Sequence, residues 1–391
     1  MSEAIALASA ALACAAWGYL LAFRGGFWLA AERDDEPEAA IAAEEWPRVV
    51  AVVPARDEAQ VIATSVESLL RQAYPGTFDI VVVDDHSADG TAGVARAAAV
   101  AARETPRLTV LSAPSLSAGW TGKLAAMDFG FQYAASLREP PDYVLFADAD
   151  ICFATDALAT LVSRAQRERL ALNSLMAKLH CESFSERALM PAFIFFFRLL
   201  YPFRWVNRPN RRTAAAAGGC MLVRRDALTA AGGLAAVRGE LIDDCALGRL
   251  MKRQGPIRLA LSDRARSLRA FRSVGDVRPM ISRSAYAQLH YSPWLLLGTV
   301  LAMAVTCLSP PVLALFATGP ARLLAAAAWA AMAVALQPTL RFYGVSPWWG
   351  AAMPMIAGLY LAFTLDSAFQ HWRGRGGMWK GRAHSPTSGT R

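Results

Sequence analysis

Between Arg48 and Asp150 the chain alternates two patterns, and this alternation limits the possible folds more than any other feature. The first pattern is an apolar run, mostly of β-branched residues, and it occurs four times: "VVAVVPA", "DIVVVDDHS", "RLTVLSA" and "YVLFADAD". The second pattern is a segment with apolar residues at helical spacing, and such segments separate the runs. Such runs are typical of strands buried on both faces, and strands that alternate with helices form βαβ units. We therefore expect an α/β domain with a mostly parallel sheet.

The fourth run ends on two acidic residues, Asp148 and Asp150. Residues i and i+2 of an extended chain point to the same side, about 6–7 Å apart by strand rise. One carboxylate can bind Mg²⁺ or Mn²⁺ directly, while the other reaches the metal through water or holds a sugar hydroxyl. A solvated loop pair is the alternative for an isolated D-x-D. The position favours function, because parallel sheets bind ligands at the carboxyl ends of their strands.

The first two strands also end near acidic residues. In "VVVDDHSADGT", Asp85 can accept hydrogen bonds from a nucleotide base or ribose. The alternative for this loop is turn formation and helix capping before Thr91. In "PARDEA", Glu58 can act in the same way as Asp85, or it can favour a helix N-terminus.

Three further features lie outside these strand ends. Asp243 and Asp244, in "GELIDDCALGRL", precede a helical pattern, so they either cap that helix or supply a general base for an attacking hydroxyl. Lys123 opens a helix after a glycine and can meet a phosphate there. The pair Gly218-Gly219 can let a substrate approach the backbone closely.

The two ends of the chain are apolar, which accounts for 55% hydrophobic residues in a chain of 391. Residues 4–23 are uncharged and numerous enough to cross a bilayer as a helix, which predicts an N-terminal anchor. A cleaved signal peptide is the alternative, but it requires a basic start that is missing. Arg24 follows this segment and favours the cytoplasmic side for what comes next.

The C-terminal part is also membrane-like. Segments 293–317, 321–337 and 347–369 are apolar, Pro310-Pro311 interrupts the first, and a basic, aromatic tail "HWRGRGGMWKGR" follows. The short alanine-rich segment 321–337 is either a tilted span or a re-entrant one, so the number of spans stays open. Residues 191–203 form either an interfacial or pocket-covering helix or an ordinary core helix.

The net charge of +8 does not indicate nucleic acid, because the arginines are spread over the chain and no aromatic-rich RNA motif accompanies them. Attraction to an anionic membrane surface explains the charge equally well. The six cysteines are scattered without C-x-x-C or His ligand spacing, so neither a disulfide framework nor a zinc site is expected. Reduced thiols suit a cytoplasmic globular part.

Taken together, the motifs resemble those of a known enzyme family. "VVPARDEA", "VVVDDHSADGT", "GKLAAM", "FADAD", "AGGCMLVRRDAL" and "DDCALG", in this order from about Arg48 to Phe271, are similar to the family 2 glycosyltransferases, inverting enzymes of the Rossmann-like GT-A fold. The anchor, the C-terminal segments and the closing "WKGR" resemble the hopanoid-biosynthesis-associated glycosyltransferases, which are relatives of ceramide and carotenoid glycosyltransferases.

The resemblance implies roles for individual residues. Ala55, Glu58 and Asp85 would line the nucleotide pocket, while Asp148 and Asp150 match the D-x-D that binds metal and diphosphate. The following positions complete the implied site: Lys123 and Gly219 beside the nucleotide sugar, Asp244 as catalytic base, Asp243 where a Glu is usual beside that base, and Arg283 in "RPMISRSAY" as the cation for the departing diphosphate, in place of the absent Q-x-x-R-W motif.

The expected protein is thus an inverting glycosyltransferase dependent on Mg²⁺ or Mn²⁺, which moves a sugar from a nucleoside diphosphate sugar, a UDP-sugar by preference, to a hopanoid-related lipid hydroxyl. It would sit in the bacterial inner membrane with the catalytic domain in the cytoplasm. Carotenoid, ceramide-like and polyprenyl phosphate acceptors are alternatives, as is a non-catalytic membrane scaffold or transport protein. The expected regions are an anchor (1–30), a GT-A domain (47–275), a juxtamembrane segment (276–292), a C-terminal membrane region (293–370) and a basic tail (371–391).

Overall fold

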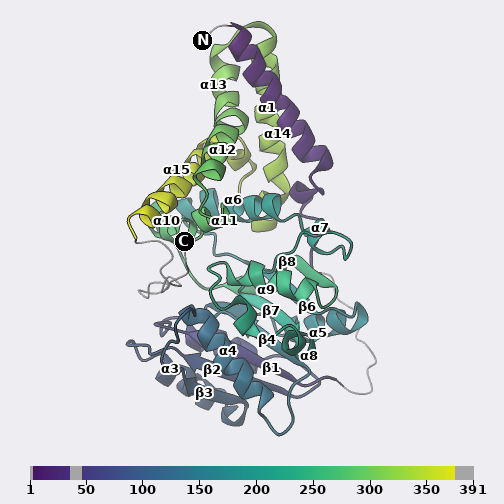
Figure 1. Cartoon of the computed structure of the whole chain (residues 1–391), viewed down its shortest axis with the longest axis vertical. Helices are drawn as coiled ribbons and strands as arrows, with labels where there is room; N and C mark the ends of the chain where they lie inside the picture. Colours follow the sequence, from purple (N-terminus) through teal and green to yellow (C-terminus); the bar gives the residue numbers. More distant parts are fainter. Residues whose placement is uncertain (1–2, 36–45, 375–391) are drawn as a thin grey trace. The chain divides into compact units, whose positions relative to one another are not determined.

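The computed structural model describes residues 3–35 and 46–374, and the chain divides into two compact units. The sheet unit comprises residues 32–35, 46–179 and 205–269, and the helical unit comprises residues 3–31, 180–204 and 270–374 (Figure 1). Residues 180–204 and 270–275, which the sequence analysis assigns to the catalytic domain, therefore group with the helices. Most of the basic tail, from residue 375, lies outside the described residues.

The sheet unit is built on one eight-stranded sheet with the strand order β3-β2-β1-β4-β7-β6-β8-β5. Its strands are β1 (Val49–Ala55), β2 (Phe78–Asp84), β3 (Leu108–Ser112), β4 (Tyr143–Ala147), β5 (Ile151–Phe153), β6 (Leu172–Lys178), β7 (Cys220–Arg224) and β8 (Ile257–Ser267). The helices around it are α2 (Ile62–Leu70), α3 (Thr91–Ala101), α4 (Gly122–Ala135), α5 (Ala157–Arg167), α8 (Arg225–Ala230) and α9 (Asp243–Lys252).

The sheet is mixed, and the expectation of parallel strands holds for the first four. β1 pairs in parallel with both β2 and β4, and β2 with β3. β7 runs antiparallel to β4 and β6, and β5 runs antiparallel to β8. A parallel connection between two neighbouring strands needs a crossover element that packs on the sheet. The long helix between β6 and β7 belongs to the helical unit instead, and β7 runs antiparallel to β6.

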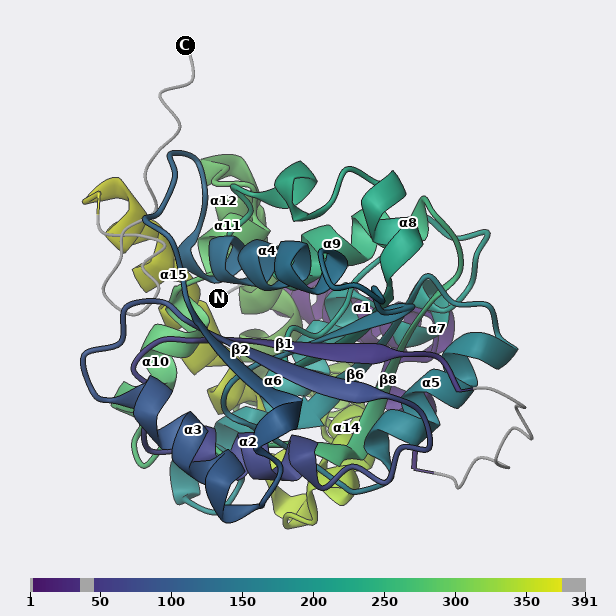
Figure 2. The same cartoon turned by 90° about the horizontal axis from the view of Figure 1, so that it is seen from below.

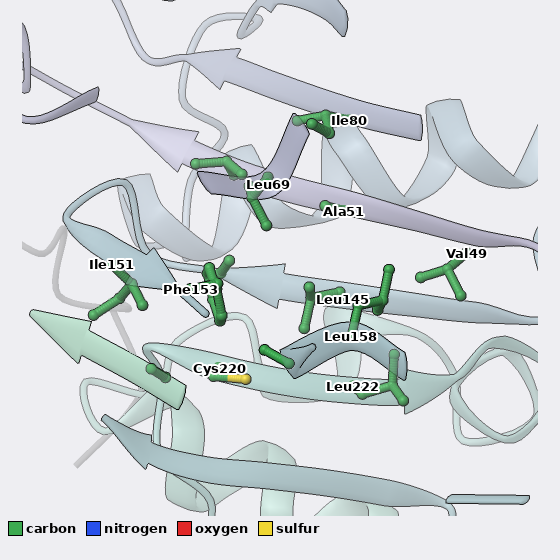
Figure 3. Packing of buried hydrophobic residues seen from close by; sticks show 14 of the residues in the cluster. Val49, Ala51, Leu69, Ile80, Leu145, Ile151, Phe153, Leu158, Cys220 and Leu222 are labelled. Atoms are coloured by element: carbon green, nitrogen blue, oxygen red, sulfur yellow. The ribbon is translucent and has the colours of Figure 1, made fainter. Parts of the chain in front are cut away.

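Burial on both faces explains why these residues form strands. Every residue of β1 is buried, as the uninterrupted apolar run predicts. Figure 2 shows α4 on one face of the sheet, with α2 and α3 on the other. On the latter face Ala51, Ile80 and Leu145 share a core with Leu69 of α2 and Leu158 of α5 (Figure 3). The sheet is thus held rigidly enough to position the side chains at its edge.

Gly130 lets α4 pack closely on the face of the sheet opposite to α2 and α3. A Cβ at Gly130 would lie 2.5 Å from Cγ1 of Val52 in β1 and 3.0 Å from Cγ2 of Val83 in β2. Because such contacts are shorter than van der Waals packing permits, a larger residue would push α4 away from the sheet. The position of Lys123, at the start of the same helix, depends on this close packing.

The helical unit contains α1 (Glu3–Phe23), α6 (Phe184–Leu200), α10 (Val274–Ser282), α11 (Ala285–Gln288), α12 (Pro293–Met303), α13 (Ser309–Phe316), α14 (Gly319–Tyr343) and α15 (Met353–Trp372), and the short α7 (Phe203–Val206) follows α6. α1, α13 and α14 run side by side (Figure 1). Trp17 of α1 donates its Nε1–H to the carbonyl of Thr306, 2.8 Å away. Trp17 and Phe195 of α6 also share an apolar core with Met332 of α14 and Met353 of α15.

Among the described residues, four helical segments are long and apolar enough to cross a membrane: Glu3–Phe23, Phe184–Val206, Pro293–Phe316 and Gly319–Tyr343. Pro310-Pro311 do not end the third segment. A π-helical turn at Ala304–Leu308 precedes them, and the helix continues to Phe316. The segment expected at 321–337 is a 25-residue helix. Residues 347–369 form a short 3₁₀ turn (Pro347–Gly350) and α15, which is not among the four.

Residues 191–203 fall mostly within α6, which lies crosswise to α14 in Figure 1. Ile194, Phe195 and Arg198 are buried in the helical unit. Nη1 of Arg198 is 3.4 Å from Oγ1 of Thr339, and its guanidinium lies over the ring of Phe203. This helix therefore packs as part of the core of the helical unit.

Candidate functional site

Lys123 forms ion pairs with two of the predicted acidic motifs in the sheet unit. Its Nζ lies 2.8 Å from Oδ1 of Asp148, which follows β4, and 3.2 Å from Oδ2 of Asp243, the first residue of α9. The Thr121 hydroxyl caps α4 by accepting from the N–H of Leu124, which places Lys123 in the first turn of the helix. Burial lowers the pKa of Lys123, but Asp148 and Asp243 outweigh it and raise this pKa above its usual range. The ammonium therefore stays charged at neutral pH.

Arg269 makes a second bridge. Its Nη2 lies 2.7 Å from Oε1 of Glu58, after β1, and its Nε lies 2.8 Å from Oδ2 of Asp150, after β4. Arg269 is a site residue that was not predicted from the sequence. The available signal was its place just past the carboxyl end of a strand, which is where α/β sheets bind ligands.

Asp244 lies in the first turn of α9 and is held by two backbone groups. Its Oδ2 accepts from the N–H of Gly218 at 3.0 Å, and its Oδ1 accepts from the N–H of Cys245 at 2.6 Å. Burial and the neighbouring charge of Asp243 raise the pKa of Asp244 to about 6, although Lys123 and the two N–H groups act in the opposite direction. A half-buried carboxylate with such a pKa is suited to take up a proton near neutral pH.

Gly218, rather than Gly219, is the glycine that faces this cluster. A Cβ at Gly218 would lie 3.1 Å from Nζ of Lys123 and 3.6 Å from Oδ2 of Asp244. A Cβ at Gly219 would instead meet the side chains of Ile151 and Ala177 in the core. Gly218 thus leaves room beside Lys123 and Asp244, whereas Gly219 lets the backbone pack against Ile151 and Ala177.

Asp85 is buried after β2 and pairs with Arg56. Nη1 of Arg56 lies 3.5 Å from Oδ2 of Asp85, and the N–H of Asp85 donates to the carbonyl of Ala55 at 2.8 Å. Asp89 accepts from the N–H groups of Ala59 and Thr91, so it has the turn and capping role given above as one of two alternatives. The loops after β1 and β2 are thereby joined into one surface.

We call Glu58, Asp148, Asp150, Asp243, Asp244, Lys123 and Arg269 the acidic cluster. Its five carboxylates and two cations leave a net charge of about −3. Burial raises the pKa of Asp148, as does Asp150, while Lys123 lowers it. A diphosphate is itself anionic, so it needs additional positive charge to bind here.

A divalent metal fits this donor set. Mg²⁺ is commonly held by one or two carboxylates together with substrate phosphates, and Asp148 and Asp150 supply such oxygens. Within residues 3–35 and 46–374, no three His, Cys, Asp or Glu side chains are grouped as a ready-made metal site. Oxygens of a bound phosphate would complete such a coordination. Arg283 lies in the helical unit, directly after α10, and its assignment to the diphosphate stays a prediction.

Comparisons with known proteins agree with this arrangement. The sequence model described as Glycosyl transferase family 2 matches residues 50–231. A mannosyltransferase from Pyrobaculum calidifontis, solved in complex with GDP-Man and Mn²⁺, is similar in structure, with a TM-score of 0.57, 20% sequence identity, and coverage of 95% of this chain and 99% of that one. No curated protein matches the sequence.

Two other similar structures are more distant. A glucosyl-3-phosphoglycerate synthase from Mycobacterium tuberculosis, solved with Mg²⁺ and uridine diphosphate, has a TM-score of 0.42 at 19% identity and covers 65% of this chain and 84% of its own. TarS 1–349 from S. aureus, solved with UDP-GlcNAc, has a TM-score of 0.38 at 14% identity and covers 84% and 92%.

The family match covers β1 to β7 and so includes the acidic residues after β1, β2 and β4, the start of α4 and the glycine pair. The mannosyltransferase extends the similarity in fold over nearly the whole chain. The chain is therefore a glycosyltransferase, and its residues 50–231 match the sequence model of glycosyl transferase family 2.

Proposed function

We propose that this glycosyltransferase moves a sugar from a nucleoside diphosphate sugar to the hydroxyl of a membrane lipid, with inversion at the anomeric carbon and with the help of Mg²⁺ or Mn²⁺. The observation that carries the proposal is the position of Asp244, a carboxylate with a raised pKa inside the cluster that contains the D-x-D pair. The mannosyltransferase of similar fold, solved with GDP-Man and Mn²⁺, supports the donor class.

Asp244 would act as the general base. Its carboxylate accepts the proton of the lipid hydroxyl, whose oxygen forms a bond to the anomeric carbon from the face opposite the diphosphate. The bond between this carbon and the diphosphate oxygen breaks, and the electron pair leaves with the diphosphate. A single displacement of this kind inverts the carbon through an oxocarbenium-like state, which resembles the transition state of glycosidases.

The other residues of the cluster would bind and orient the donor. Asp148 and Asp150 would hold the metal, which when bound offsets charge on the departing diphosphate. Lys123 holds Asp148 and Asp243 in place by its two contacts. Asp85, Glu58 and Ala55 would line the nucleotide pocket at the ends of β1 and β2, and Gly218 would border the sugar.

The lipid acceptor is inferred from the apolar helices. Four segments long and apolar enough to cross a bilayer favour a membrane location, and an acceptor dissolved in the bilayer would then be at hand. The resemblance to hopanoid-associated enzymes makes a hopanoid the first acceptor to test. Carotenoids, ceramide-like lipids and polyprenyl phosphate are the next ones, and the bacterial inner membrane with a cytoplasmic active site is the proposed location.

A transport function has less support. Asp366 of α15 stands in an apolar segment, but Nε of Arg278 in α10 lies 3.4 Å from its Oδ2. Intramembrane charges that form a transport pathway usually occur as clusters that face a water-filled cavity. A single ion pair between two helices of one unit is better explained as a structural contact.

A donor screen tests the proposal. The full-length protein in detergent is titrated with UDP- and GDP-sugars, with and without Mn²⁺ or Mg²⁺, and both binding and release of the nucleoside diphosphate are measured. We expect metal-dependent binding of one sugar nucleotide, lost in D148A and D150A but kept in D226A, which changes an exposed aspartate of α8. Absence of binding for every nucleotide sugar would refute the proposed donor class.

A further inference from the structure

The side chain of Arg269 spans the ends of two neighbouring strands, at the edge of the sheet where α/β proteins bind ligands. Glu58 follows β1 and Asp150 follows β4, and these two strands are paired neighbours. The chain runs from β1 outward to β2 and β3, and then returns to the other side of β1 with β4, so the winding reverses between them. One guanidinium contacts both strand ends across this reversal.

The local fold delivers Arg269 to this place. The three-residue strand β5 begins directly after Asp150 and pairs antiparallel with the end of β8, with Ile151 opposite Ser267. The N–H of Leu268 donates to the carbonyl of Asp150 at 2.7 Å. The next residue, Arg269, is therefore held beside the Asp150 carboxylate by backbone pairing, and not by side-chain attraction alone.

The two bridges of the acidic cluster differ in accessibility. The side chain of Lys123 is 18% exposed and points among Asp148, Asp243 and Gly218. The side chain of Arg269 is 39% exposed, so an entering ligand can reach it. A guanidinium offers several N–H donors in a planar fork that matches phosphate as well as carboxylate, so it can change from one partner to the other without losing its charge.

We propose that Arg269 is a positioning residue that occupies the Asp150 and Glu58 carboxylates until the donor arrives, and that it then turns to the diphosphate and leaves Asp150 for the divalent metal. Metal and donor would therefore bind interdependently: Arg269 opposes metal binding to the empty site and favours nucleotide binding. This inference rests on the proposed function, because it takes the donor to be a nucleoside diphosphate sugar.

The experiment measures Mn²⁺ binding and nucleotide binding separately on the full-length protein in detergent. In the first arm Mn²⁺ alone is titrated and the free ion is followed by its EPR signal. We expect R269Q to bind Mn²⁺ about tenfold more tightly than the unchanged protein, because loss of one charge-assisted contact frees Asp150. The matched control R266Q changes an exposed arginine of β8 and should leave Mn²⁺ affinity unchanged.

In the second arm UDP and GDP are titrated at a Mn²⁺ concentration that saturates both proteins. We expect R269Q to bind the preferred nucleotide about tenfold more weakly, since it has lost a phosphate partner. A residue with a merely structural role would lower both affinities, whereas the proposal requires opposite signs. Unchanged or weaker Mn²⁺ binding by R269Q would overturn it, as would undiminished nucleotide binding.

R269K covers the case in which R269Q does not fold, which thermal unfolding in detergent would show. A single ammonium cannot contact Asp150 and Glu58 with two separate nitrogens, so Mn²⁺ affinity should lie between those of the unchanged protein and R269Q. An affinity equal to or below that of the unchanged protein would overturn the proposal. The Mn²⁺ arm uses no nucleotide, so failure of the donor assignment and failure of the Arg269 inference give different results.

Discussion

The carboxylate of Asp244 accepts a hydrogen bond from the backbone N–H of Gly218 at 3.0 Å, in a place where a Cβ on residue 218 would approach both Asp244 and Lys123. The loop that leads into β7 and the first turn of α9 are thereby joined. This contact holds one oxygen of Asp244 while burial and Asp243 keep its pKa near 6. The arrangement leads to predictions for the base, for its pH dependence and for the helix that carries it.

Replacement of Asp244 by Asn should remove turnover and keep donor binding. Asn retains the shape of the side chain and an oxygen that can accept from Gly218, but it cannot take up the proton. We expect kcat to fall by about 10²–10⁴, the usual contribution of a general base, with the Kd of the nucleotide essentially unchanged. D226N is the matched control on the exposed surface of α8. Full activity of D244N would exclude Asp244 as the base.

The rate should depend on pH through the same group. Because Asp244 must be ionised to act, kcat/KM should rise as pH increases through about 6 and level off above it. The charge of Asp243 raises the pKa of Asp244, so D243N should lower that pKa and move the acid limb of the profile to lower pH. Profiles of the two proteins test this, and a limb that moves to higher pH in D243N would contradict the assignment.

Gly248 controls how closely α9 packs. A Cβ at this residue would lie 2.7 Å from the carbonyl carbon of Ala215, which is backbone and cannot turn aside. G248A should therefore displace α9, lower the free energy of unfolding by about 1–3 kcal/mol, and reduce kcat by misplacing Asp244. The control is G93A in α3, where a Cβ meets nothing within 4 Å.

G93A should be neutral or stabilising by up to about 1 kcal/mol, because Ala is favoured over Gly inside helices. Thermal unfolding in detergent compares the two variants. Equal unfolding midpoints for G248A and G93A would mean that α9 can shift without cost.

Glu186 should stabilise the start of α6. Its buried carboxylate accepts from the N–H groups of Glu182 and Ser183 and, at 2.6 Å, from that of Phe271, which lies far along the chain. E186A leaves these buried donors without their acceptor and should cost about 2–3 kcal/mol of stability. E182Q changes an exposed neighbour and is the control. An unfolding midpoint for E186A equal to that of E182Q would show that these hydrogen bonds contribute little.

The protein should behave as an integral membrane protein. Four apolar helices of 21–25 residues are long enough to cross the hydrocarbon layer. We expect the chain to remain in the membrane fraction after extraction with alkaline carbonate and to dissolve only with detergent. Release into the soluble fraction by carbonate would mean that these helices are covered by protein and do not span the bilayer.

The sequence by itself predicts the local elements and the family. A run such as "VVAVVPA" is buried on both faces whatever its neighbours are, so β1 is recognisable from composition and period alone. The acidic residues at the ends of β1, β2 and β4 can be located from the sequence for the same reason, because the end of each apolar run marks the end of its strand. The motif order also predicts the glycosyltransferase family that the comparison with known sequences bears out.

Tertiary structure alone decides which charges meet. β7 enters the sheet antiparallel between β4 and β6, a pairing that no local pattern encodes. Arg269 reaches Glu58 from 211 residues away, and Gly218 reaches Asp244 through the packing of α9. Such contacts depend on the order of the strands and on the positions of the helices. These are set when whole apolar faces of the sheet and of the helices are buried against one another. Local sequence specifies which residues carry charge, and only the assembled sheet brings those charges together.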